Sequence, residues 1–474
     1  MKKLLVSLLV ISACGGSADV SSVEEDTTTT TKSDKSDTIE VESEIIIALN
    51  NASDEAKNCI KDRWPDGVEH VLGGHIPNEN ETNLIYSCID NPDGSKEKNS
   101  ESEEKKSHSE VNYTADEHWR SRWEGKCEGT GTVMFANSPM KIEDIHSLSP
   151  YGQIVGGHIT PIDHMYFEPK DRSLGRDAYE VRAIQDAYIF DISVREVAAE
   201  SQEKQKPEYR LDMVHTCTFG SYFDLVTSLS PELDTIFNNG NFKGTHVEAG
   251  DLIGYIGAQT LDFGVYNYDD PLDFINPEAY AREPWKIYTH DPFLYFPPEI
   301  RDQLLNKMIR KVEPRVGKIN YDVDGTLSGN WFEVGTNFYD GTNQSKYWDG
   351  HFSLSLHPID PSFWQIGIGF LDTYDNTFII QGNPDPLDVT VEHGKQIYEL
   401  FIGETYIVND PDKKWWGTPY DENDIYGVRL NTDSQRRYIM LELLETRLLR
   451  VEVFFNVNRD TITEFTANSR DYER

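Results

Sequence analysis

Short stretches of alternating apolar and polar residues recur along most of this chain, separated by turn-forming Gly, Asn and Asp. A period of two places one side of a β-strand in a core, whereas an amphipathic helix repeats about every 3.6 residues. Such stretches lie at Ala178–Ile184, Tyr188–Ile192 and Tyr209–His215, and again around Phe352, Trp364 and Leu449. The pattern predicts a mainly β protein with antiparallel sheets, in which residues 317–474 form a small barrel or sandwich.

Few segments have the helical period. Residues Pro298–Ile309 begin with a proline and repeat apolar side chains at Ile300, Leu304 and Met308, which predicts a helix within a connector at 297–316. Two shorter segments, Ser53–Cys59 and Asn80–Cys88, start with capping or acidic residues. They predict a small helical pair at residues 50–92.

The N-terminus has the order of a secretion signal. Lys2 and Lys3 precede a short apolar run, and Ile11-Ser-Ala-Cys14 resembles a bacterial lipobox. The run is too short to span a bilayer, which takes about 20 apolar residues. The resemblance implies that residues 1–14 are a lipoprotein signal peptide, that Cys14 is lipidated, and that the protein is extracytoplasmic and lipid-anchored to a bacterial membrane.

Composition marks two segments that we expect not to fold. Residues 15–45 are rich in Ser, Thr and acidic side chains and predict a disordered tether, and residues 93–117 predict a linker. Over the whole chain, 82 acidic residues against 44 basic ones give a net charge of −38. This balance argues against nucleic-acid partners and leaves the lipid anchor as the contact with the membrane.

The remaining cysteines predict disulfides. Without Cys14 the chain has an even number of cysteines, which outside the cytoplasm favours two bridges with three possible pairings. We expect Cys59–Cys88 and Cys127–Cys217, because each pair then lies within one predicted domain. Zinc binding by these cysteines is the weaker alternative, since no C-x-x-C pair exists.

Residues 118–296 contain three motifs that belong together: Gly157–His164, Gly250–Gly254 and Thr260–Phe263. With them, this region resembles the lysostaphin-type (LytM-like) zinc endopeptidases, which cut peptidoglycan cross-bridges. The resemblance implies a central antiparallel β domain of the duplicated hybrid motif type, with a hairpin at Val247–Gly254. It also implies a zinc site formed by His158, Asp163 and Asp262.

Three positions depart from the family pattern. Asp224 and Thr260 stand where the family has its catalytic histidines, and Asp262 stands where it has a zinc-binding histidine. One imidazole with two carboxylates contains more hard oxygen donors than the usual ligand set of zinc. The cofactor could therefore be zinc or another divalent metal. A carboxylate at Asp224 repels a developing oxyanion, and Thr260 cannot shuttle a proton at neutral pH. His164 or His215 could replace the missing groups in space.

These departures favour a degenerate peptidase domain. We expect a non-catalytic protein that binds or scaffolds at the cell wall, with peptidoglycan or an envelope protein as its partner. The alternative is a metal-dependent endopeptidase that acts on peptidoglycan cross-bridges.

Two weaker motifs lie at the start of the C-terminal region. Gly329-Asn-Trp331 resembles the Gly-x-Trp start of lipocalin or avidin-like barrels, although a core tryptophan explains it equally. Asn320, Asp322 and Asp324 match the first half of an EF-hand loop, but Trp331 occupies its twelfth position, which predicts a turn without calcium.

Overall fold

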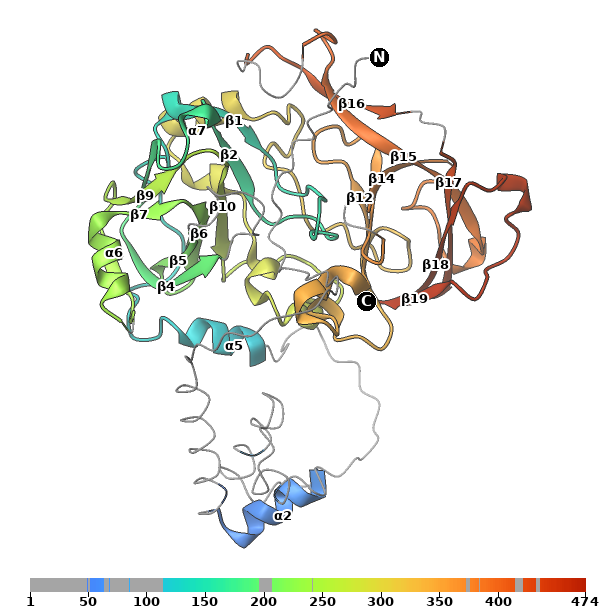
Figure 1. The fold of residues 1–474 in the computed structure, drawn as a ribbon, viewed down its shortest axis with the longest axis horizontal. Coiled ribbons are helices and arrows are strands. Elements are labelled where there is room, and N and C mark those ends of the chain that lie inside the picture. Colours follow the sequence, from blue (N-terminus) through green and yellow to red (C-terminus); the bar gives the residue numbers. More distant parts are fainter. Residues whose placement is uncertain are drawn as a thin grey trace, which may run out of the picture. The chain divides into compact units, whose positions relative to one another are not determined.

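The computed structural model describes residues 49, 52–63, 68, 85, 114–195, 207–240, 242–371, 376–382, 384–413, 421–431 and 435–474. They belong to two compact units, one within residues 20–111 and one that runs from residue 112 to the C-terminus. The protein is mainly β with antiparallel sheets and few helices, as the alternating pattern predicted (Figure 1). The predictions for Cys14, for the segments 1–14 and 15–45 and for most of the linker 93–117 lie outside the described residues.

The smaller unit contains the first predicted helix, α2 (Asp54–Arg63). Its start is capped by Ser53, whose Oγ accepts a hydrogen bond from the Ala56 amide at 3.1 Å. In the second predicted helix only Ile85 is described, and it is helical. Cys59 is disulfide-bonded, but Cys88 lies outside the described residues.

The larger unit begins with a seven-stranded antiparallel sheet. In spatial order its strands are β1 (Ile145–Ser149), β2 (Met165–Pro169), β10 (Leu261–Asn267), β6 (Phe219–Val226), β5 (Glu208–Thr216), β4 (Ala187–Arg195) and β8 (Thr245–Val247). A three-stranded sheet lies beside it, with the order β3 (Tyr179–Arg182), β9 (Leu252–Ile256) and β7 (Ser228–Leu229). The α-helices of this unit are α5 (Thr114–Ser121), α6 (Pro231–Asn238) and α7 (Pro298–Lys307).

Helix α7 confirms the prediction for Pro298–Ile309, two residues shorter at its C-terminal end. The predicted bridge Cys127–Cys217 is also confirmed. It joins the segment after α5 to the turn between β5 and β6, 90 residues along the chain.

The predicted hairpin at Val247–Gly254 is wrong. The chain does turn there, with the Asp251 amide donating to the Glu248 carbonyl at 3.0 Å. However, β8 pairs with β4, whereas β9 pairs with β3 and β7 in the other sheet. The turn therefore carries the chain from one sheet to the other, and the strands on either side of it, β8 and β9, do not pair with each other.

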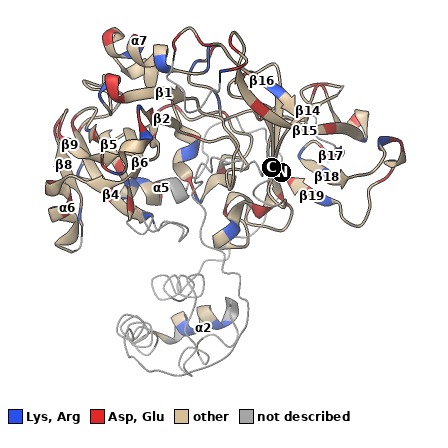
Figure 2. Cartoon of the chain, turned by 45° about the horizontal axis from the view of Figure 1, so that its top comes forward, with Lys and Arg blue, Asp and Glu red and all other residues tan. Residues whose placement is uncertain are grey.

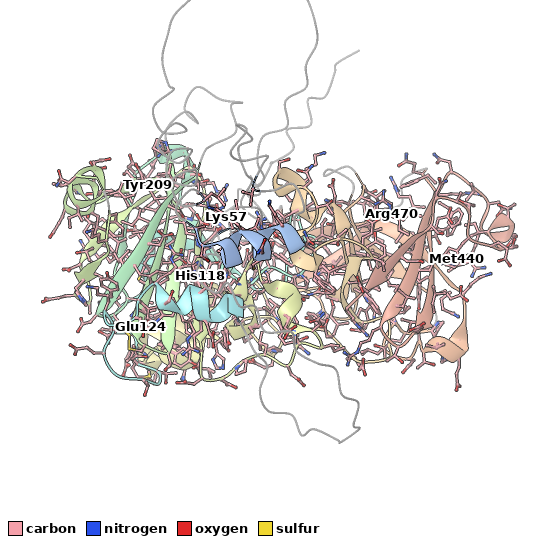
Figure 3. All side chains as sticks on the ribbon, turned by 90° about the horizontal axis from the view of Figure 1, so that it is seen from below. Lys57, His118, Glu124, Tyr209, Met440 and Arg470 are labelled. Carbon is pink, nitrogen blue, oxygen red and sulfur yellow. A yellow bond between two sulfur atoms is a disulfide. The ribbon has the colours of Figure 1, made fainter. Side chains whose placement is uncertain are left out.

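The C-terminal region forms a nine-stranded antiparallel sheet. Its strands are β11 (Gly329–Glu333), β12 (His351–Leu356), β13 (Trp364–Ile368), β14 (Thr377–Gln381), β15 (Gln396–Ile407), β16 (Tyr426–Asn431), β17 (Arg437–Glu445), β18 (Leu448–Phe455) and β19 (Arg470–Glu473). The pairings run β14-β13-β12-β11-β19-β18-β17-β15, and β14 also pairs with β15, so they close into a ring to which β16 is attached. In Figure 3, Met440 and Arg470 lie in this part, and Tyr209 lies in the part built on the seven-stranded sheet.

Trp331 is part of the apolar core of the closed ring. Its side chain is fully buried, and its indole N–H donates to the Leu327 carbonyl at 3.0 Å. The guanidinium of Arg474, the last residue, lies over the indole at 4.0 Å from the ring centroid. The Gly-x-Trp tryptophan is thus a core residue. The EF-hand-like residues hold turns, since Asp322 accepts from the Asn330 amide and Asp324 pairs with Arg447.

Short 3-10 helices connect the strands. They are η1 (Ile142–Asp144), η2 (Arg172–Leu174), η4 (Pro277–Tyr280), η5 (Pro284–Tyr288), η6 (Pro292–Tyr295), η7 (Phe338–Asp340), η8 (Gln344–Gly350), η9 (Val391–His393) and η10 (Arg459–Thr461). None of the described helices is both long and apolar enough to cross a membrane.

The loop between β1 and β2 packs against the C-terminal sheet. Gln365 donates to the Gly152 carbonyl at 2.8 Å, and Asn376 donates to the Gly156 carbonyl at 2.7 Å. At Gly157 a Cβ atom would lie 3.1 Å from the ring of Trp348, so a larger residue would require this ring to shift by a few tenths of an ångström. This loop carries His158 and Asp163, and its contacts fix it between the two sheets.

Candidate functional site

One face of the seven-stranded sheet carries a buried polar cluster. Because side chains alternate along a strand, β10 places Phe263 on the opposite face from Asp262. All seven residues of β10 are buried, so this sheet is covered on both sides. On the polar face, Asp262 lies opposite Asp224 of β6 and opposite Tyr166 of β2.

His164 is at the centre of this cluster. Its Nδ1 lies 3.4 Å from Oδ1 of Asp163, and its Nε2 lies 3.3 Å from Oδ2 of Asp262. The three residues are only 3–7 % exposed. Neither imidazole nitrogen is oriented for a hydrogen bond, and Asp163 Oδ2, Asp262 Oδ1 and the Tyr266 hydroxyl also have no hydrogen-bond partner within the described residues.

A lysine supplies the positive charge next to Asp163. Lys286 of η5 is 2 % exposed, and its Nζ lies 3.3 Å from Oδ1 of Asp163. The same Nζ lies 3.7 Å from Oε2 of Glu283 and 5.4 Å from the ring centroid of Tyr339. Burial would raise the pKa of Asp163, but the ammonium group of Lys286 and the nearby His164 hold it well below its usual value.

Two arginines neutralise the other carboxylates. Arg195 pairs with Asp224 through both of its carboxylate oxygens. Arg210 donates to Asp212 at 2.9 Å and lies 3.8 Å from Asp224, with its guanidinium over the ring of Tyr222. Charged residues of both signs are spread over the larger unit (Figure 2), but these pairs are buried or half-buried beside the His164 cluster.

The charges of the cluster nearly balance without any added ion. Lys286, Arg195 and Arg210 lie beside Asp163, Asp224 and Asp212, and Lys286 also contacts the partly exposed Glu283. The remaining carboxyl group is that of Asp262, whose pKa is raised to about 7 by burial, although His164 and the arginines oppose the shift. Burial thus favours the protonated form of Asp262, and the protein's own groups neutralise most of the charge of the cluster.

The structure brings most of the predicted site residues together. Asp163 and Asp262 flank His164, and the ring centroid of His158 lies 6.0 Å from that of His164. Burial, followed by His164 and Lys286, lowers the pKa of His158 to about 3, so this imidazole is neutral. Thr260 is buried immediately before β10.

His215, the other possible substitute, makes separate contacts. Its ring nitrogens lie 3.0 Å from the Asp186 carbonyl oxygen and 2.9 Å from the Ser221 hydroxyl. It has a structural role at the start of the β5–β6 turn.

The donor set does not fit a catalytic zinc ion. Such an ion needs three ligands that converge on one point and a fourth position for water. Here the two nitrogens of His164 face different carboxylates, and Lys286 already lies at Asp163. In the described part of the chain, no group of three or more His, Cys, Asp or Glu side chains is arranged to hold a metal ion.

The three cationic side chains beside the cluster, those of Lys286, Arg195 and Arg210, could not be recognised from the sequence. Lys286 lies in Glu283-Pro-Trp-Lys286, which carries no recognisable motif and lies more than a hundred residues from Asp163. Arg210 lies within the predicted stretch Tyr209–His215, and Arg195 lies three residues beyond the end of Tyr188–Ile192, but the pattern does not say which carboxylate each faces. Their roles follow only from the pairing of β4, β5 and β6.

The buried side chain of His351, next to this cluster, should make the stability of the protein sensitive to acid. It is 1 % exposed, and its Nε2 lies 3.0 Å from the Tyr339 carbonyl. Burial, with Lys286 and Arg282 nearby, lowers its pKa from 6.5 to about 3, so the folded protein binds fewer protons than the unfolded chain between these values. The contribution of His351 to stability is complete above pH 6.5 and is lost as the pH falls toward 3, by about 1.4 kcal/mol per pH unit.

We therefore expect His351→Gln, which keeps a donor for the carbonyl, to reduce the decrease in unfolding free energy between pH 6.5 and pH 4. Urea unfolding at a series of pH values measures this slope. An unchanged slope in the variant would contradict the assignment.

Comparison with protein-family models, with curated proteins and with solved structures found no match. The fold and the site define a mainly β protein with a buried, internally neutralised cluster of carboxylates.

Proposed function

We propose that this chain is a lipid-anchored protein of the bacterial envelope, whose degenerate LytM-like domain binds or scaffolds at the cell wall without cutting it. One observation carries the non-catalytic part. Of the three carboxylates that align with the family's metal-binding and catalytic residues, Asp163 is paired with the protein's own Lys286, and Asp224 with Arg195 and Arg210. A water-activating metal would have to displace Lys286 from Asp163.

The surroundings of the cluster support the same proposal. Peptide hydrolysis needs an opening through which the substrate reaches the catalytic groups, but Asp163, His164 and Asp262 are at most 7 % exposed. The loop that carries Asp163 is held against the C-terminal sheet, whose closed ring of strands we interpret as the small β-barrel expected from the sequence. A buried cluster beside this sheet suits a binding or scaffold role better than hydrolysis.

The test combines a binding assay with an activity assay on the purified full-length chain. We expect it to contain no stoichiometric metal, to sediment with cross-linked peptidoglycan, and to release no peptides from it with Zn²⁺, Mn²⁺ or Mg²⁺ added. Absence of sedimentation would refute cell-wall binding and leave an envelope protein as the partner.

The second candidate, a metal-dependent endopeptidase, is favoured by the unpaired polar atoms around His164. Release of peptides that is abolished by Asp262→Asn, but not by Asp360→Asn in the β12–β13 loop, would establish this activity and overturn the first proposal.

The membrane anchor is tested separately. Cys14→Ser should move the protein from the membrane fraction to the soluble extracytoplasmic fraction, because the lipid can no longer be attached. Cell fractionation followed by detergent phase partitioning measures this. The matched control Cys127→Ser removes a structural cysteine and should leave the protein in the membrane fraction.

A further inference from the structure

The contact between Lys286 and Asp163 has the geometry of a bond-forming site. The amine nitrogen and Oδ1 are 3.3 Å apart, and the residues are 2 % and 6 % exposed. We propose that Nζ of Lys286 and Cγ of Asp163 become joined by an intramolecular amide bond. This inference goes beyond the proposed function and depends only on the geometry of the cluster.

The groups needed to move protons are already in contact with the pair. Oε2 of Glu283 lies 3.7 Å from Nζ of Lys286 and can accept a proton from it. On the other side, Nδ1 of His164 lies 3.4 Å from Oδ1 of Asp163. It makes no hydrogen bond in this arrangement, so the imidazole must turn toward that oxygen to deliver a proton to it. A nucleophile, a base and an acid therefore surround one carboxyl carbon, which is the arrangement that acyl chemistry needs.

The reaction balances without any other reagent. Glu283 takes one proton from the ammonium group, and the neutral amine attacks Cγ of Asp163. Since a carboxylate is a poor electrophile, His164 must protonate Oδ1 as the C–N bond forms. The C–Oδ1 bond then breaks, and the leaving oxygen takes a second proton from Glu283, so that it departs as water. The second proton lost by the nitrogen returns to His164, which leaves Glu283 and His164 as they began. An ammonium ion and a carboxylate thus become one amide and one water molecule.

Burial favours the amide over the ion pair of Lys286 and Asp163. Two charges held out of water carry a large desolvation penalty, which their mutual attraction offsets only in part. The amide is neutral and removes this penalty, and exclusion of water protects it from hydrolysis. The bond would join the β1–β2 loop to η5, 123 residues further along the chain. It would also consume the Asp163 carboxylate as a metal ligand.

Peptide mapping of the full-length chain tests the proposal. After reduction and proteolysis, we expect the peptides that contain Asp163 and Lys286 to appear as one branched species, lighter by one water molecule than their sum. Lys286→Arg should give two separate peptides. Lys395→Arg, which changes an exposed lysine paired with Glu464, should leave the branched species unchanged. If the native chain yields only separate peptides, the proposal is wrong, while the proposed function still stands.

Two further variants test the chemistry. Asp163→Asn should still form the bond but lose ammonia in place of water, which gives the same branched species from an amide side chain. Glu283→Gln should slow bond formation in newly synthesised protein about a hundredfold, the lower end of what a general base contributes. Retention of the Cys127–Cys217 bridge shows that each variant is folded. Formation at the native rate in Glu283→Gln would overturn the role of Glu283.

Discussion

Lys286→Met should lower the free energy of unfolding by about 3–5 kcal/mol, which is typical when one partner of a buried ion pair is removed. The methionine fills a similar volume, so the main effect is an uncompensated carboxylate at Asp163, which is 6 % exposed. Urea unfolding at neutral pH measures the change. The expectation holds with or without the proposed amide bond, because loss of the bond would add to the loss of stability.

Two control variants separate charge from packing. The double variant Lys286→Met/Asp163→Leu should regain part of the lost stability, because it removes the unpaired carboxylate as well. Lys395→Met breaks an exposed pair with Glu464 and should change stability by less than about 1 kcal/mol. A similar loss in Lys286→Met and Lys395→Met would show that Lys286 does not neutralise the cluster.

Trp331→Ala should cost about 3–5 kcal/mol, the usual range for removal of a large aromatic side chain from a core. The indole is fully buried within the closed ring of strands, donates to the Leu327 carbonyl and lies beneath the guanidinium of Arg474. Removing the indole leaves a cavity and removes the aromatic ring against which Arg474 packs. Thermal and urea unfolding measure the loss.

Phe455→Ala is the matched control. Phe455 is at the end of β18 and is 42 % exposed, so its removal should cost much less than the loss of Trp331. If Trp331→Ala were as mild as Phe455→Ala, the closed ring would not depend on this tryptophan for its core.

Much of the fold could be predicted from local patterns. The alternation at Tyr188–Ile192 and Tyr209–His215 corresponds to β4 and β5, and the proline-led repeat at Pro298 corresponds to α7. The Cys127–Cys217 bridge was also predicted correctly. These features depend on residues close in sequence or on few possible partners. The prediction failed at Val247–Gly254, because the turn was recognised but the strands that pair with its flanks are distant in the chain.

The sequence by itself determined which residues share a face of each strand. A period of two places Asp262 on the opposite face from Phe263, and the motifs single out Asp163, Asp224 and Asp262 as one group. Only the tertiary structure decided what covers the polar face. Lys286 arrives from η5, Arg195 and Arg210 from neighbouring strands, and His164 lies between two carboxylates. Charge neutralisation acts through space, so the order of residues along the chain does not reveal it.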